Sequence, residues 1–215
     1  MNSEHQQLCT SPEWEAHLQT TVLPSVVNGL VLGDEMLELG PGPGAATDWL
    51  RRRVRRLVVV ERDMQAANTL RDRFEATNVE VVHGDATVLP FAADSFDSVA
   101  AFTMLHHVPT RPLQARVLSE ALRVVRPGGV LFGSDSLHSD ELHHFHRDVT
   151  YNPIEPATLL GLLGAHGYVR IAIGMPPRPW TLDRLGLSDR AGRMWCPCPR
   201  RARRIPRSSV VKLLR

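Results

Sequence analysis

The sequence predicts an α/β fold, a doubly wound and mostly parallel sheet with helices on both faces. Short apolar runs alternate with longer segments of helical period along most of the chain, and no internal repeat is present. The run Leu57–Val60 is apolar at every position, as is typical of a strand buried on both faces. A chain of 215 residues, 43% of them hydrophobic, is long enough to bury such a core without disulfide bonds.

Residues 1–32 are predicted to form an N-terminal helical segment. Ser11 is a good helix cap, because its hydroxyl can accept from the first free backbone amides, and Pro12 suits the first turn that follows. This helix runs toward Val22. We expect it to be interrupted or kinked at Pro24, which has no backbone N–H to donate.

The predicted domain that follows, residues 33–174, alternates strands with helices. Strands are expected at 36–39, 57–60, 79–82, 97–102, 130–132 and 168–173, and helices at 45–53, 64–76, 113–124 and 157–163. Glycine-proline clusters at 40–44 and 127–129 end the elements before them. Sheets of this kind bind ligands outside the carboxyl ends of their strands. The site is therefore expected at the residues that directly follow each apolar run.

Residues 175–215 differ from this domain in composition. Residues 1–174 carry 14 arginines and 21 acids, whereas residues 175–215 carry 11 basic residues, 2 acids and 6 of the 16 prolines. We expect this segment to be a basic, proline-rich and irregular tail with at most short helical pieces and no part in ligand binding. A shifted reading frame and a lineage-specific extension both account for such a tail.

Three glycines alternate in the segment after the first strand. Without a Cβ atom, Gly40, Gly42 and Gly44 allow a ligand to approach the backbone closely. The next helix would then direct its positive N-terminal end at that ligand. A tight turn that simply requires glycine accounts for the same pattern.

Two acids stand at the ends of the next two strands. Glu61 lies 21 residues after Gly40, at a spacing where a carboxylate accepts hydrogen bonds from both hydroxyls of a ribose. Asp85 can accept from an exocyclic amine such as that of adenine. Taken singly, Glu61 is equally a solvated acid and Asp85 a cap or an Asx turn. Together with the glycines, they favour a nucleoside pocket.

Seven short motifs follow one another in a fixed order. They are LELGPGPG at 37–44, VERD at 60–63, GDA at 84–86, LPF at 89–91, SFDSV at 95–99, LHHV at 105–108 and EALRVVRPGG at 120–129. This order resembles the class I S-adenosylmethionine (SAM) dependent methyltransferases, which have a Rossmann-like sheet. The resemblance is closest to the small single-domain group that includes quinone-ring methyltransferases, and it covers about residues 11–174.

The resemblance implies SAM as the cofactor and assigns its site. The implied cofactor-binding residues are Glu38, Gly40, Gly42, Gly44, Glu61, Asp85, Ala86 and Thr103. Glu38 would face the ammonium group of SAM, with the glycine backbone holding the methionine end. Glu61 would bind the ribose, Asp85 the adenine amine, and the Ala86 amide would lie close to the ring. Thr103 and its neighbours would line the floor near the sulfonium.

The end of the domain departs from the family pattern. The family usually closes its sheet with a strand hairpin, one strand of which is antiparallel. The sequence offers the strand 168–173 but no convincing partner after it, and Val210–Leu214 is a weak candidate. We therefore expect the C-terminal edge of the sheet to be incomplete.

The residues after the fourth strand favour a small, fairly apolar methyl acceptor. Ala101–Met104 lacks the Asn/Asp-Pro-Pro-aromatic signature of nitrogen methyltransferases acting on DNA or protein, and it offers no acid to Mg²⁺. Holding acceptor and methyl group in line can supply about 7–11 kcal/mol of the barrier. A base is needed only if the acceptor must lose a proton. His106 or His107 could be that base, or could pack over the cofactor or face solvent, so no catalytic residue is assigned.

No metal site and no specific nucleic-acid partner are predicted. Histidines 138, 143, 144 and 146 gather in the sequence, and two of them share a helical face, but they do not have the spacing of a closed metal site. Cys196 and Cys198 are expected to be free thiols. The arginine-rich run 51–56 ends a helix in an acidic domain and lacks interleaved aromatics, which favours a solvated face.

SAM-dependent methyl transfer is the leading function, and two others stay open. One is a SAM-binding protein without catalysis. The other is a nicotinamide-dependent oxidoreductase, which is weakened by the missing third glycine at dinucleotide spacing. No apolar run approaches the ~20 residues of a membrane span, and residues 1–10 show no secretory signal, so a cytoplasmic location is expected. The oligomeric state is not predicted.

Overall fold

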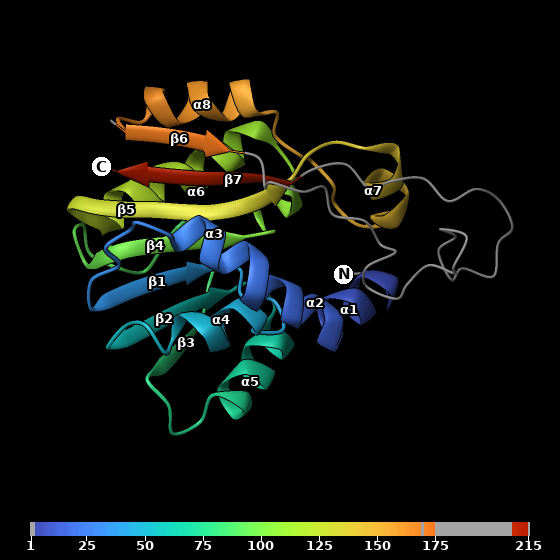
Figure 1. Cartoon of the computed structure of the whole chain (residues 1–215), viewed down its shortest axis with the longest axis horizontal. Coiled ribbons are helices and arrows are strands. Elements are labelled where there is room, and N and C mark those ends of the chain that lie inside the picture. Colours follow the sequence, from blue (N-terminus) through green and yellow to red (C-terminus); the bar gives the residue numbers. More distant parts are fainter. Residues whose placement is uncertain (1–2, 169, 175–207, 215) are drawn as a thin grey trace, which may run out of the picture.

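The computed structural model describes residues 3–168, 170–174 and 208–214, which form one seven-stranded sheet covered by helices on both faces (Figure 1). The strands are β1 Glu35–Leu39, β2 Arg56–Glu61, β3 Val79–His83, β4 Phe96–Phe102, β5 Val125–Ser136, β6 Arg170–Gly174 and β7 Ser208–Leu214. Their order in the sheet is β3-β2-β1-β4-β5-β7-β6. Strands β1 to β5 pair in parallel, whereas β7 is antiparallel to both of its neighbours. The predicted fold class is confirmed.

Eight α-helices accompany the described strands. They are α1 Ser3–Cys9, α2 Pro12–His17, α3 Leu23–Val27, α4 Ala45–Leu50, α5 Met64–Arg73, α6 Arg111–Val124, α7 Asp140–Phe145 and α8 Pro156–Ala165. Among them, α7 was not expected from the sequence, and α1 lies within the predicted N-terminal helical segment, before the helix start expected at Ser11. None of the helices in the described ranges is both long and apolar enough to cross a membrane.

The N-terminal helical segment continues past its proline. Ser11 caps α2 as expected, because its side chain accepts from the amide of Trp14. The run then passes through a π-helical turn, Leu18–Val22, in which the amide of Leu23 donates to the carbonyl of Leu18. Pro24 cannot donate the next α-helical hydrogen bond, and the wider turn before it absorbs this loss. The helix therefore changes its hydrogen-bonding pattern before Pro24 and continues as α3.

Alternate residues of the central strands face two separate apolar cores. In β1, Leu37 and Leu39 pack with residues of α6 and α8 on one face of the sheet. Met36 faces the other side, with residues of α3 and α4. Full burial of such side chains stabilises the fold by about 1.5–3 kcal/mol each relative to exposure. Burial on both faces explains why these strands read as continuous apolar runs.

The C-terminal strand corrects the expectation of an incomplete sheet edge and of an irregular tail throughout 175–215. β7 lies between β5 and β6 and pairs with both along its length (Figure 1). A strand with partners on both sides satisfies its backbone groups whatever the composition of the chain before it. The sequence analysis gave Val210–Leu214 little weight as a strand because the segment that contains it is basic and rich in proline. Residues 175–207 of the predicted tail lie outside the described residues.

Candidate functional site

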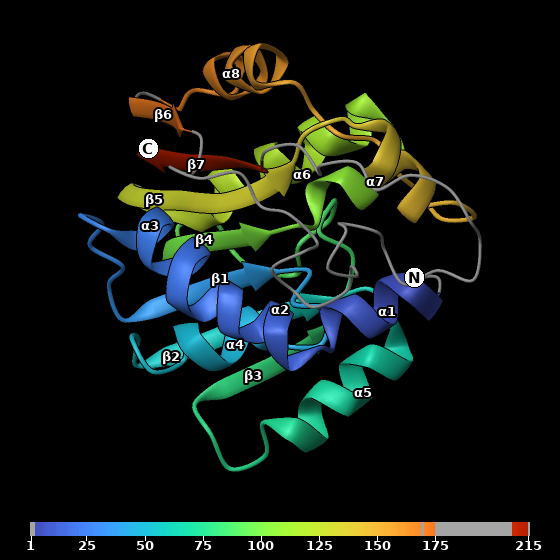
Figure 2. The same cartoon turned by 45° about the vertical axis from the view of Figure 1, so that its right-hand side comes forward.

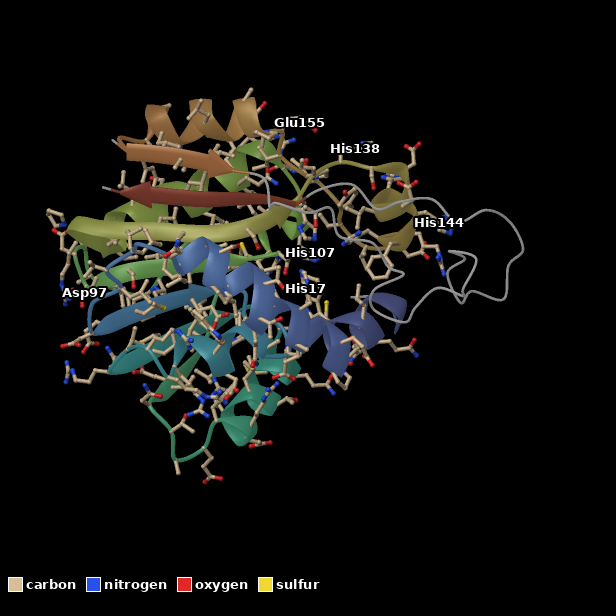
Figure 3. All side chains as sticks on the ribbon, in the orientation of Figure 1. His17, Asp97, His107, His138, His144 and Glu155 are labelled. Carbon is tan, nitrogen blue, oxygen red and sulfur yellow. The ribbon has the colours of Figure 1, made fainter. Side chains whose placement is uncertain are left out.

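The predicted cofactor residues come together at the carboxyl edge of the parallel strands. Gly40 follows β1, and its amide donates to the carbonyl of Val60 in β2 at 3.0 Å. The amide of Gly84, after β3, donates to the carbonyl of Glu61 at 2.9 Å. The ends of three adjacent strands are thus joined at one edge. Helix α7 lies beyond this edge (Figure 2), whereas Asp97 lies at the opposite end of the sheet (Figure 3).

The three alternating glycines are required for different reasons. All have positive φ, at 62° for Gly40, 54° for Gly42 and 90° for Gly44. A Cβ atom on Gly40 would lie 2.8 Å from Cβ of Met104, and one on Gly44 would lie 2.8 Å from the ring of Phe74. A Cβ atom on Gly42 would meet no described atom within 4 Å. Packing therefore explains two of the glycines, and only Gly42 adjoins open space.

Glu38 is a buried acid on β1. Its side chain is 1% exposed, and its Oε2 accepts from the hydroxyl of Thr47 on α4 at 2.6 Å. Burial raises the pKa of Glu38 to about 7, and the hydrogen bond from Thr47 opposes this rise only in part. A cation placed beside Glu38 would therefore stabilise its ionised form and lower its pKa.

Glu61 and Asp85 are partly exposed and already form local hydrogen bonds. Oε1 of Glu61 accepts from the amide of Asp63 at 2.9 Å. Oδ1 of Asp85 accepts from the amide and hydroxyl of Thr87 at 2.8 Å and 2.7 Å, so the Asx turn considered for this residue is present. Burial acts to raise the pKa of Asp85, but the bonds from Thr87 and the charge of Arg62 hold that pKa below its usual range. Asp85 is therefore ionised at neutral pH.

Thr103 makes the turn at the end of β4. Its φ of 49° lies in the left-handed region, which is strained for a β-branched residue. The turn is fixed because the amide of Thr103 donates to the carbonyl of Ser134 at 2.7 Å. It leads into the 3₁₀ turn Leu105–His107. Ala86, the remaining predicted residue, packs partly buried against the apolar core.

A histidine cluster, which consists of His106, His107 and His146, lies beyond β4 and β5. One ring nitrogen of each residue lies within 4.8 Å of those of the other two. The ring centroids of His106 and His107 are 4.1 Å apart, and those of His106 and His146 are 5.0 Å apart. His146 also stacks on Tyr151, with centroids 4.5 Å apart. Histidines from two segments far apart in the sequence thus share one small volume.

Burial keeps two members of the cluster uncharged. Burial lowers the pKa of His107 to about 3, and a proton on His106 would act in the same direction. Burial likewise lowers the pKa of His146 to about 4. His106 is 2% exposed, and its Nδ1 contacts the carboxylate of Asp135 on β5. Burial acts to raise the pKa of Asp135, but His106 and nearby amides hold that pKa below its usual range.

Buried polar contacts hold the cluster in place. Nε2 of Gln114 on α6 donates to the carbonyls of Leu105 and Asn152, at 2.9 Å and 2.7 Å. The amide of Asn152 donates to the carbonyl of His106 at 2.7 Å. Oδ2 of Asp135 accepts from the amide of Leu105 at 2.8 Å. The cluster is therefore built on a cross-linked set of loops at the end of the sheet.

Sequence reasoning found part of this cluster. It placed His106 and His107 near the acceptor, but it grouped His146 with its sequence neighbours. The structure brings His146 to the first two and leaves His138, His143 and His144 exposed. His107, His138 and His144 are labelled in Figure 3. The spacing of His146 along the chain carries no signal of this contact, which depends on the position of α7.

The arginine-rich run 51–56 forms local ion pairs. The pairs are Arg51 and Arg52 with Asp48, Arg55 with Asp34 and Glu35, and Arg56 with Glu35 and Glu80. The guanidinium of Arg53 lies over the ring of Trp49. Acids of α4, β1, β3 and the turn before β1 thus compensate most of these charges, in keeping with the structural interpretation of the run.

Comparisons with known proteins find similarity over the part of the chain that includes this edge. Residues 37–133 match a family model described as a methyltransferase domain. The phthiotriol/phenolphthiotriol dimycocerosates methyltransferase 1 of Mycobacterium ulcerans is 31% identical over 124 residues, which are 57% of this chain and 45% of that protein. The fatty-acid O-methyltransferase of Mycolicibacterium smegmatis is 30% identical over 127 residues, 58% of this chain and 45% of that protein. The chain spans less than half the length of these two relatives.

A solved structure shows the same fold. The N-methyltransferase NodS from Bradyrhizobium japonicum, in complex with S-adenosyl-L-homocysteine, matches with a TM-score of 0.68 at 15% identity. The match covers 99% of this chain and 92% of that chain. The matched family segment contains all eight residues that the sequence assigned to the cofactor. The chain thus resembles methyltransferases over residues 37–133 and shares the fold of a solved methyltransferase structure.

Proposed function

We propose that this chain transfers the methyl group of SAM to a small-molecule acceptor at the carboxyl edge of the sheet. The observation that carries the proposal is that backbone hydrogen bonds of Gly40 and Gly84 join the ends of three adjacent strands, with open space at Gly42. When bound, SAM supplies an electrophilic methyl group on a sulfonium. The chain's own residues hold and orient the two reactants.

The residues of the edge suit the parts of this cofactor. Glu38 is buried and has a raised pKa, so a ligand ammonium group would stabilise its ionised form. Glu61 would accept from ribose hydroxyls, with its orientation fixed by the amide of Asp63. Asp85 is ionised and would accept from the adenine amine. These roles support cofactor binding before any acceptor is considered.

The surroundings of the histidine cluster favour an acceptor with an apolar part. Phe145 and Tyr151 lie against His146, with ring centroids 5.3 Å and 4.5 Å away. The relatives described above are named for a fatty acid and for phthiotriol or phenolphthiotriol dimycocerosates. We therefore extend the proposal to a lipid-like or similarly apolar small molecule.

Incubation of the purified chain with methyl-labelled SAM and an extract of its own cells tests this function. Label in the organic-solvent fraction, lost in a Glu61→Ala variant, is the expected result. Label that enters only protein or nucleic acid would contradict the acceptor class. SAM binding without any transfer would instead support a binding protein, and calorimetric binding of NAD but not SAM would support an oxidoreductase. The cytoplasmic location and the lack of a nucleic-acid partner stay predictions.

A further inference from the structure

Each histidine of the cluster directs its Nδ1 at a group that can only accept a hydrogen bond. The contacts are His106 Nδ1 to Asp135 Oδ1, His107 Nδ1 to the Thr150 carbonyl at 3.1 Å and His146 Nδ1 to the Leu142 carbonyl at 2.7 Å. Because a carboxylate or a carbonyl has no proton to donate, Nδ1 must carry the proton in each neutral ring. The lone pair of each ring is therefore on Nε2.

The burial of Nε2 of His106 without a hydrogen-bond partner among the described residues is a second observation that points to a ligand, beside the grouping of the three rings. Nε2 of His106 is buried and has no hydrogen-bond partner within the described ranges. Buried polar atoms are nearly always satisfied in native proteins by protein, water or a bound ion. Here the nearby candidates are ring nitrogens of His107 and His146. With Nδ1 protonated, those rings present lone pairs at Nε2, which cannot satisfy another lone pair.

We propose that His106, His107 and His146 bind a divalent transition-metal ion, such as Zn²⁺, through their Nε2 atoms. Three nitrogens that each lie about 2.0–2.1 Å from a tetrahedral zinc ion would be about 3.4 Å apart. One ring nitrogen of each histidine lies within 4.8 Å of one ring nitrogen of each of the other two, so side-chain rotations that direct the three Nε2 atoms inward would complete the site. Ions such as Mg²⁺ and Ca²⁺ prefer oxygen ligands, whereas imidazole suits zinc, cobalt, nickel and copper.

Asp135 gives the cluster the outer contact that metal-binding histidines usually have. A carboxylate that accepts from the far nitrogen of a ligating imidazole fixes its tautomer and increases its basicity. Asp135 is itself held, because its Oδ2 accepts from the amide of Leu105 and its Oδ1 from the amide of Ser136. The carbonyls of Thr150 and Leu142 have the same role for His107 and His146, because each accepts from the Nδ1 of its ring.

Three protein ligands would leave a fourth position open to another molecule. The position would take an oxygen, nitrogen or sulfur atom of the methyl acceptor, and this assignment rests on the proposed function. The cluster directly follows the Thr103 turn at the end of β4, beside the edge assigned to the cofactor. The metal would thereby position the acceptor.

Cobalt titration of the chelator-treated protein tests the metal site itself. One Co²⁺ per chain is expected, with visible absorption bands of a four- or five-coordinate ion, and Zn²⁺ should displace it. His146→Gln should weaken binding about 100-fold and Asp135→Asn about 10- to 100-fold. His144→Gln, which changes an exposed histidine of the short helix that precedes His146, should bind Co²⁺ within about twofold of the parent.

Two results would overturn the site. One is no stoichiometric binding of Co²⁺ or Zn²⁺ at about 100 µM by a folded parent, and the other is binding that survives both His106→Gln and His146→Gln. Thermal melts confirm that each variant is folded. SAM affinity, measured in parallel, should stay within about twofold in His146→Gln. Metal binding without SAM binding would contradict the proposed function alone, and SAM binding without metal binding would contradict this site alone.

Discussion

At the scale of single residues, the burial of Glu38 raises the pKa of its carboxyl group and so favours a positively charged ligand beside it. Its carboxyl group is buried on β1 with a hydroxyl as its hydrogen-bond partner, so its neutral form is favoured until a cation arrives. The acid is thus balanced between two charge states near neutral pH. This balance has a direct consequence for the stability of the ligand-free protein.

Glu38→Gln is expected to change how the free energy of unfolding depends on pH. The folded-state pKa of about 7 lies above the ordinary value of 4.5, so the native state holds this proton more tightly than the unfolded state. The resulting stabilisation is complete below pH 4.5 and is lost as the pH rises through 7. Relative to the parent, the variant should gain on the order of 3 kcal/mol between pH 4 and pH 8. Urea unfolding at both pH values measures this, and a difference that is constant with pH would contradict it.

Gly42→Val is expected to abolish SAM binding while leaving the domain folded. The positive φ of Gly42 costs a side chain on the order of 1–2 kcal/mol, and the side chain would project into the open space beside the edge. Gly29→Val is the matched control, because Gly29 has a φ of 77° and also has no described atom within 4 Å of an added Cβ. Calorimetry should show unchanged SAM affinity for the control. Equal losses in both variants would mean that backbone strain alone causes the effect.

Glu61→Ala is expected to weaken SAM binding by about 30- to 1000-fold. Loss of two charge-assisted hydrogen bonds to the ribose costs on the order of 2–4 kcal/mol. Glu75→Ala removes the same charge from an exposed position just after α5 and should bind SAM as the parent does. If Glu61→Ala also binds SAM as tightly as the parent, the ribose assignment is wrong.

At the scale of elements, the sequence predicted best what is set by local pattern. The runs that became β1 to β3 are largely apolar and are ended or followed by a glycine or an acid, so both their existence and the candidate residues at their ends could be predicted from the sequence. The motif at 120–129 also contains residues that hold a loop in place. Glu120 accepts from the amide of Leu89, and Arg123 donates to the carbonyls of Leu89 and Phe91. These two residues attach the loop before β4 to α6.

The elements that the sequence missed depend on distant partners. Helix α7 is a six-residue element, too short to show a period, and its importance comes from placing the neighbouring His146 beside His106 and His107. β5 begins at Val125, before the glycines expected to precede it, because Val125 pairs with Phe96 across an irregularity in the ladder. The positions of the proposed cofactor residues at the strand ends were therefore predictable one by one. The histidine cluster was not, since three-dimensional contact alone defines it.

At the scale of the whole molecule, the chain end closes the sheet. The order β5-β7-β6 means that β6 joins the sheet only through β7 in the described structure. The residues assigned to the cofactor belong to β1–β4 and the turns after them, on the other side of β5. If the proposed cofactor residues are correct, removal of the last strand should affect stability much more than cofactor binding.

Deletion of residues 208–215 is expected to lower Tm by on the order of 10 °C, because each kcal/mol of lost stability lowers Tm by about 2–4 °C in a domain of this size. The deletion removes both ladders of β7 and exposes the edge of β5, an open template for aggregation. Val211→Pro should have a smaller effect in the same direction, because it removes one backbone donor where β7 pairs with Gly133 and Ile173. Removal of Arg215 alone is the control.

The folded fraction of the deletion variant should keep SAM affinity within several-fold of the parent. An unchanged Tm would contradict the two-sided pairing of β7, and complete loss of SAM binding by folded protein would contradict the division of the sheet between stability and cofactor binding.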